Sequence, residues 1–228
     1  MSLQTIELNP GGEPAASIVV LHGLGADGTD FLSLADELDL AAVGPLRWLL
    51  PRAPVRPVTL NNGYRMRAWY DILGTELERA QGAPREDAAG LRVAFAQVHA
   101  LLDREVARGV PAQRIVLAGF SQGCAVALGA GLRYPRRLAG LAGLSGYLPL
   151  AETTATERHA ANHDVPIFLA HGTRDAVVPH ARGAGSRDAL AALGYRPAWH
   201  EYPMEHSVSR EELADLERWL LNVLHPTA

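Results

Sequence analysis

The stretch Gly119-Phe120-Ser121-Gln122-Gly123 joins an apolar run, residues 114–120, to a helical pattern that extends to Tyr134 and is stopped by Pro135. Its glycines leave room for a sharp strand-to-helix turn that exposes a serine hydroxyl above a sheet. The pattern G-x-S-x-G is weak alone, but its place between strand and helix makes it more specific. We therefore predict that Ser121 is a nucleophile. The structural alternative is a serine that caps the helix beside packing glycines.

Short apolar runs alternate with helical patterns along the rest of the chain. Runs rich in Leu, Ile and Val and bounded by Gly or Pro are typical of buried strands, and they occupy residues 18–21, 46–50, 114–120, 138–144 and 165–170. Residues 196–202 form a weaker, alternating run that is typical of an edge strand. This order predicts an α/β fold of the α/β-hydrolase type, with a mostly parallel central sheet and helices on both faces.

For two helices the sequence predicts the position along the chain as well as the buried face or the cap. Apolar residues recur at three- and four-residue steps through residues 87–106, and Ser209 and Glu212 have the spacing of a capping box before the last helix. No repeat or linker interrupts the sequence, so residues 1–228 are predicted to form one α/β-hydrolase domain. Residues 74–85 are polar and loop-like, and they are interpreted as a possible lid.

The composition excludes several functions. All 21 basic residues are arginine, and 25 acidic residues give a formal net charge of −4 without any basic run. Binding to nucleic acid is therefore not expected. Without lysine, Schiff-base chemistry, pyridoxal attachment and a P-loop are excluded. We expect a reaction that needs neither a cofactor nor a metal.

The sequence favours a cytoplasmic protein without integral membrane contact. Residues 1–10 lack the basic start and apolar stretch of a secretory signal. The longest apolar tract, residues 138–151, is broken by glycines and Pro149, and it is shorter than the roughly 20 residues that cross a bilayer. The single cysteine, Cys124, excludes an internal disulfide and fits a reducing compartment.

A serine hydroxyl needs a base, and in this fold the chain order is serine, acid, histidine. His206 alone, among the histidines after Ser121, lies in the short loop between the last strand and the capped helix. By contrast, the sequence places His200 within the strand, His225 past the last helix, and His159 and His163 before the strand that begins near residue 165. We predict His206 as the base. A solvated loop histidine is the alternative.

The acid is expected directly after a strand, where it can orient the imidazole. Asp175 follows the run 165–170, whereas Asp164 precedes it and Asp188 falls in a later helical stretch. Asp175 is therefore the predicted acid, and an Asx-turn residue is the alternative. Backbone N–H groups that stabilise an oxyanion are expected from Gln122, beside the nucleophile, and from the glycine-rich residues 22–28.

The chain resembles the phospholipase/carboxylesterase family, which includes acyl-protein thioesterases. The matching landmarks cover nearly the whole chain and are residues 21–25, 51–59, 69–71, 119–123 and 171–175. The resemblance implies a carboxylic ester hydrolase with a catalytic triad and an acyl-enzyme intermediate. It implies catalytic roles for Ser121, Asp175 and His206, oxyanion donors at Leu24 and Gln122, and an apolar acyl groove to which Trp69 and Leu73 contribute.

The sequence departs from the family in places that bear on substrate choice. Cys124 follows Gly123 where the family usually has glycine, and Gly146-Tyr147 replaces the cysteine and tryptophan of animal members. The preferred acyl length therefore stays open, and so does the choice among carboxylic esters, lysophospholipids and S-acylated proteins. An apolar rim around the groove could also support a homodimer.

Other interpretations remain. The chain could be a binding protein that keeps the hydrolase fold without catalysis, or a metal-dependent hydrolase that uses His159 and His163, although no acid has the zincin spacing. Trp69 and Tyr70 could be core residues. Cys124 is interpreted as a small buried helix residue and not as a nucleophile.

Overall fold

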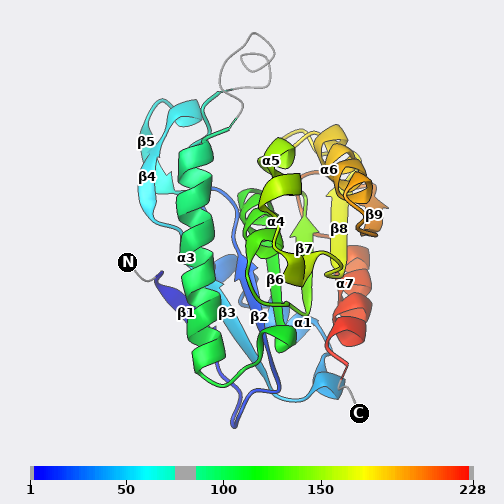
Figure 1. Ribbon diagram of the computed structural model, residues 1–228. Coiled ribbons are helices and arrows are strands. Elements are labelled where there is room, and N and C mark those ends of the chain that lie inside the picture. Colours follow the sequence, from blue (N-terminus) through cyan, green and yellow to red (C-terminus); the bar gives the residue numbers. More distant parts are fainter. Residues whose placement is uncertain (1–2, 75–85, 226–228) are drawn as a thin grey trace.

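A seven-stranded sheet forms the centre of the computed structural model, which describes residues 3–74 and 86–225 (Figure 1). In spatial order the strands are β1 (Thr5–Leu8), β3 (Leu46–Pro51), β2 (Ala16–Leu21), β6 (Ile115–Phe120), β7 (Gly140–Leu144), β8 (Ile167–Gly172) and β9 (Ala198–Tyr202). All neighbours pair in parallel except β1 and β3. The predicted mostly parallel sheet is confirmed, and β9 lies at its edge as its alternating pattern indicates.

Two antiparallel features were not predicted. Strand β1 pairs with β3 at the opposite edge of the sheet. Strands β4 (Val55–Val58) and β5 (Tyr64–Arg67) form a separate hairpin, which lies beyond the carboxyl ends of the central strands in Figure 1. Each of these strands has only four residues, and none has a buried apolar run, so the sequence offers little signal for them.

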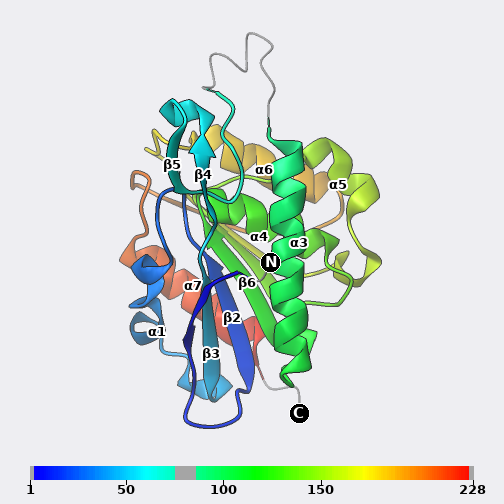
Figure 2. The ribbon, with the colours of Figure 1, turned by 90° about the vertical axis from the view of Figure 1, so that its left-hand side faces the viewer.

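Helices cover both faces of the sheet, as predicted. Helices α3 (Ala88–Ala107), α4 (Gln122–Arg133), α5 (Ala151–Glu157) and α6 (His180–Ala192) lie on one side, and α1 (Leu34–Glu37) and α7 (Arg210–Val223) lie on the other (Figure 2). Short 3-10 helices complete the connections at Thr29–Phe31, Ala41–Val43, Thr59–Asn61, Ala112–Arg114 and Ala160–Asn162.

The two faces of the sheet belong to separate hydrophobic clusters. In β2, Val19 packs in the cluster on the α3 and α4 side, whereas Ile18 and Val20 pack in the cluster on the α1 and α7 side. This alternation follows from the two-residue period of a strand. Because both faces are covered, every residue of β2 is buried, which explains its continuous apolar sequence.

The helix starts match the sequence prediction closely. The Asp87 side chain accepts a hydrogen bond from Gly90 N–H and caps α3. Ser209 and Glu212 form the predicted capping box of α7, which packs on the sheet and brings the Trp219 ring to 5.8 Å from that of Phe168. The suggested lid over residues 74–85 lies, except for Gly74, outside the described residues. Among residues 3–74 and 86–225, no helix has the length and apolarity needed to cross a membrane.

Candidate active site

Ser121 stands on a strained turn between β6 and α4. Its φ of 54° and ψ of −118° are unusual for a residue with a side chain. A Cβ atom on Gly119 would lie 2.3 Å from the Gly123 carbonyl oxygen, and one on Gly123 would lie 2.1 Å from the Leu21 carbonyl oxygen. Only glycine fits at these two positions, because the turn presses α4 against its own strand and against β2.

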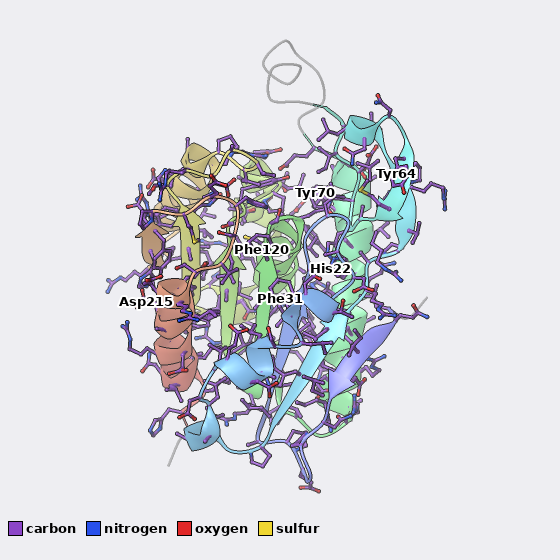
Figure 3. The ribbon with its side chains drawn as sticks, turned by 180° about the vertical axis from the view of Figure 1, so that it is seen from behind. His22, Phe31, Tyr64, Tyr70, Phe120 and Asp215 are labelled. Carbon is purple, nitrogen blue, oxygen red and sulfur yellow. The ribbon has the colours of Figure 1, made fainter. Side chains whose placement is uncertain are left out.

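His206 lies between β9 and α7 and faces the serine. Its Nε2 is 2.9 Å from Ser121 Oγ, and its Nδ1 is 2.7 Å from Asp175 Oδ2. Because a carboxylate only accepts hydrogen bonds, Nδ1 carries the proton and Nε2 accepts the serine hydroxyl. The ring also packs 4.8 Å from the ring of Phe120, which in turn lies beside Phe31 of the loop after β2 (Figure 3).

Asp175 follows β8 and is held by its own loop. Its side chain is fully buried, and Oδ1 accepts the backbone N–H groups of Val177 and Val178, each at 2.9 Å. The other oxygen, Oδ2, is therefore directed to His206. The structure brings together the three residues that the sequence singled out, although they come from three separate loops.

A second histidine contacts the same carboxylate, and the sequence analysis did not single it out. His171 Nε2 lies 3.4 Å from Asp175 Oδ2 and 2.9 Å from the Val178 carbonyl oxygen, to which it donates. Burial lowers the pKa of His171, so the ring is neutral near pH 7 and carries its proton on Nε2. Its position at the end of a buried strand, four residues before Asp175, was the available signal.

The two expected backbone donors lie beside the nucleophile. Leu24 and Gln122 line the same cavity as Ser121, and Gln122 is the first residue of α4, where a backbone N–H has no intrahelical acceptor. The Gln122 side chain accepts Trp69 N–H and donates to the Tyr70 carbonyl, both at 2.8 Å. These bonds hold the segment after β5 against the start of α4.

The loop that carries Leu24 is anchored by His22, another residue not singled out from the sequence. His22 is buried, its Nδ1 lies 2.7 Å from the Gly23 carbonyl oxygen, and its Nε2 lies 3.0 Å from Ala53 N. Because the Ala53 N–H must donate, Nε2 accepts and Nδ1 carries the proton. Burial lowers the pKa of His22, which favours this neutral form.

A cavity of about 160 Å³ opens at the serine. Besides Ser121, Gln122 and Leu24, its wall contains an apolar group, Leu60, Ile72, Leu73, Val177 and Val178, and a polar group, Tyr70, Asp71, Glu86, Tyr147 and Arg182. Leu73, which the sequence analysis assigned to the acyl groove, lines this cavity. Trp69 does not line this cavity: its side chain is buried, and the indole N–H donates to the His22 carbonyl at 2.8 Å. A buried indole needs such a partner, which turns Trp69 into the core.

Two residues of the alternative interpretations have structural roles. Cys124 is buried in α4, and burial raises the pKa of its thiol to about 12, so little thiolate forms at neutral pH. His159 accepts Ala161 N–H and caps the Ala160–Asn162 helix. Within the described ranges, no cluster of three or more His, Cys, Asp or Glu side chains has the geometry of a metal site.

The sheet order, the turn at Ser121 and the loops after β8 and β9 define the α/β-hydrolase class. The chain matches the phospholipase/carboxylesterase family model over residues 4–224 and belongs to that family. It is therefore a carboxylic ester hydrolase.

The similar proteins agree with this assignment. Acyl-protein thioesterase 1 of Yarrowia lipolytica is 40% identical over 209 residues, which is 90% of each chain. Acyl-protein thioesterase 1 of Schizosaccharomyces pombe is 40% identical over 188 residues, or 82% of this chain and 81% of that protein. The crystal structure of Zea mays acyl-protein thioesterase 2 superposes with a TM-score of 0.84 at 33% identity, and it covers 97% of this chain and 99% of the maize chain.

Proposed function

We propose that the protein hydrolyses carboxylic esters and thioesters through a Ser121–His206–Asp175 triad and an acyl-enzyme intermediate. The observation that carries this proposal is the continuous chain of contacts from Ser121 Oγ to His206 Nε2 and from His206 Nδ1 to Asp175 Oδ2, at 2.9 and 2.7 Å. Both distances lie within the reach needed for general base catalysis.

In the acylation step, His206 Nε2 takes the proton of Ser121 as Oγ bonds to the substrate carbonyl carbon. The carbonyl oxygen becomes an oxyanion, which the backbone N–H groups of Leu24 and Gln122 stabilise. The carbonyl re-forms as the bond to the leaving alcohol or thiol breaks, and the leaving group takes the proton from His206. Asp175 holds the imidazole orientation and stabilises the transient imidazolium.

In the deacylation step, water takes the place of the leaving group. His206 accepts a proton from the water as the water oxygen bonds to the acyl carbon, and a second oxyanion forms in the same place. Collapse of this intermediate breaks the bond to Ser121 Oγ, which recovers its proton from His206, and it releases the carboxylic acid. Apart from the substrate and water, every group in this cycle is a side chain or a backbone group of this chain.

Thioesters belong in the proposal because similar proteins are named acyl-protein thioesterases. The same serine mechanism serves both ester classes, since in each the nucleophile attacks an acyl carbonyl carbon and only the leaving atom, oxygen or sulfur, differs. Lysophospholipid hydrolysis and protein S-deacylation are the candidate principal activities within this chemistry, and the substrate panel below separates them from small esters.

The test compares wild type with Ser121→Ala on aryl esters and thioesters of increasing acyl length, a lysophospholipid and an S-acylated peptide. We expect Ser121→Ala to reduce turnover by several orders of magnitude while its thermal melting stays cooperative. An organophosphonate should label wild type covalently and leave the variant unlabelled. Substantial turnover by the variant would overturn the serine mechanism, and a folded wild type that neither turns over nor labels would favour the binding-protein interpretation.

A further inference from the structure

The polar part of the cavity wall has no part in the proposed reaction. Tyr70 and Tyr147, from segments 77 positions apart, bring their hydroxyl oxygens to 2.8 Å of each other. Burial raises the pKa of both phenols, so both stay protonated in the neutral pH range. Only one of the two O–H groups can donate within the pair. The pair therefore has a second O–H and oxygen lone pairs for other partners, and Arg182 is one of these partners of Tyr147.

Charged groups from two other elements adjoin this pair. The Arg182 guanidinium of α6 lies 3.5 Å from the centroid of the Tyr147 ring. Glu86, just before α3, accepts the Leu150 N–H at 2.7 Å. The wall here presents a cation, an anion and two phenols, so it contains both donors and acceptors. A plain alkyl chain would lie against these polar groups without forming a hydrogen bond to any of them, so it matches this part of the wall poorly.

We propose that the acyl site selects substrates whose acyl chain carries a neutral hydrogen-bonding group, such as a hydroxyl, which binds at Tyr70, Tyr147 and Arg182. The inference rests on the proposed function and specifies its substrate class. The apolar side chains, such as Leu73 and Val178, would pack along the methylene part of the same chain.

A neutral terminus fits this wall better than a carboxylate. Arg182 would attract an acid, but Glu86 and Asp71 also line the cavity, and a third carboxylate would meet their repulsion in a partly desolvated site. A hydroxyl can donate to Glu86 or a phenol and can accept from Arg182 or the other phenol. The balance of donors and acceptors therefore selects a group that does both.

The experiment uses three aryl esters of equal chain length whose acyl groups end in methyl, hydroxyl or carboxylate. We expect wild type to show a kcat/KM for the hydroxyl-ended ester roughly five- to tenfold above that for the methyl-ended ester, the range of one hydrogen bond. The carboxylate-ended ester should be slowest. Arg182→Met and Tyr147→Phe should bring the hydroxyl-to-methyl ratio close to one. Arg187→Met is the matched control, because Arg187 lies on the same helix over the Trp199 ring and does not line the cavity.

The outcomes separate this inference from the proposed function. Suppose that Ser121→Ala loses activity on all three esters, while wild type turns over the methyl-ended ester at least as fast as the hydroxyl-ended one. The serine mechanism would then stand, and the hydroxyl preference would be overturned. Fastest turnover of the carboxylate-ended ester would also overturn it, in favour of an acid-binding site. If Tyr147→Phe does not fold, the comparison of Arg182→Met with Arg187→Met decides the question.

Discussion

The imidazole Nε2 of His22 accepts the backbone N–H of Ala53 at 3.0 Å, so the loop after β2 is tied to the loop after β3. The backbone carbonyl of the same histidine accepts a hydrogen bond from the indole N–H of Trp69. Leu24, the proposed oxyanion donor, follows two residues later. The position of that donor therefore depends on a side chain that does not line the cavity.

Replacement of His22 should accordingly impair catalysis more than binding. We expect His22→Ala to lower kcat by about ten- to a hundredfold with a smaller change in KM, because a displaced oxyanion donor costs transition-state stabilisation. Steady-state kinetics on one aryl ester measures the split. His99→Ala is the control: His99 is also partly buried and bonds a backbone carbonyl, that of Ala130, but it lies on α3 away from the serine. Equal losses in both variants would indicate a general folding defect.

The second histidine at Asp175 should act as a positioning residue. His171→Phe removes the N–H that lies between Asp175 and the Val178 carbonyl, so the Val178 carbonyl oxygen loses this donor. We expect kcat to fall about three- to tenfold, the usual effect of one neutral hydrogen bond, with KM nearly unchanged. His171→Gln, which restores an N–H donor, should recover part of the loss. If His171→Phe and His171→Gln had the same kcat and KM, the hydrogen bond from His171 would have no positioning role.

The buried carboxyl of Glu212 should make the stability of the protein depend on pH. Its side chain is buried at the start of α7, and desolvation raises its pKa from 4.5 to about 8, against a smaller opposing effect of the bond from Ser209. Because this folded-state pKa lies above the unfolded value, the folded protein holds a proton that the unfolded chain releases between these pH values. The free energy of unfolding should therefore fall as pH rises through this window, by at most about 1.4 kcal/mol per pH unit.

Denaturant unfolding at several pH values tests this. Glu212→Gln keeps the shape and the bond from Ser209 N–H but cannot ionise, so its stability should decline less than that of wild type between pH 5 and 8. Glu211→Gln is the control in the same helical turn, because Glu211 is exposed and its pKa is lowered, not raised. If Glu211→Gln flattened the profile and Glu212→Gln did not, the assignment to the buried carboxyl would be wrong.

The sequence predicted the parts of the molecule that local pattern and chain order control. The buried strands and the capped helices are visible as apolar periods. Ser121, Asp175 and His206 could be proposed together because parallel strands place their carboxyl ends, and the loops that follow them, along one edge. Residues that act through contacts between distant segments left no such pattern. His22, for example, acts through a bond to Ala53, 31 positions along the chain.

The cavity wall also depends on contacts between distant segments, which the sequence did not predict. Tyr147 follows β7, Arg182 belongs to α6, and their stacking depends on how the loop after β7 meets that helix. Trp69 was expected at the acyl groove, yet its indole finds a partner at His22 and turns inward. The short strands β1, β4 and β5 were missed because four residues at an edge need no apolar run.

Because the backbone at Ser121 is strained, a variant that relieves the strain should be more stable than wild type, although it is inactive. A residue with a side chain at φ 54° and ψ −118° is held in a sparsely populated conformation, at a cost of roughly 1–3 kcal/mol. Ser121→Gly should relieve this strain and abolish turnover. We expect its melting temperature to rise by about 2–4 °C for each kcal/mol recovered, whereas Ser121→Ala, which keeps the Cβ atom, should not show that rise. Calorimetry of the two inactive variants isolates the backbone effect, since both lack the hydroxyl bonded to His206. Equal melting temperatures would mean that the turn stores no strain that glycine can release.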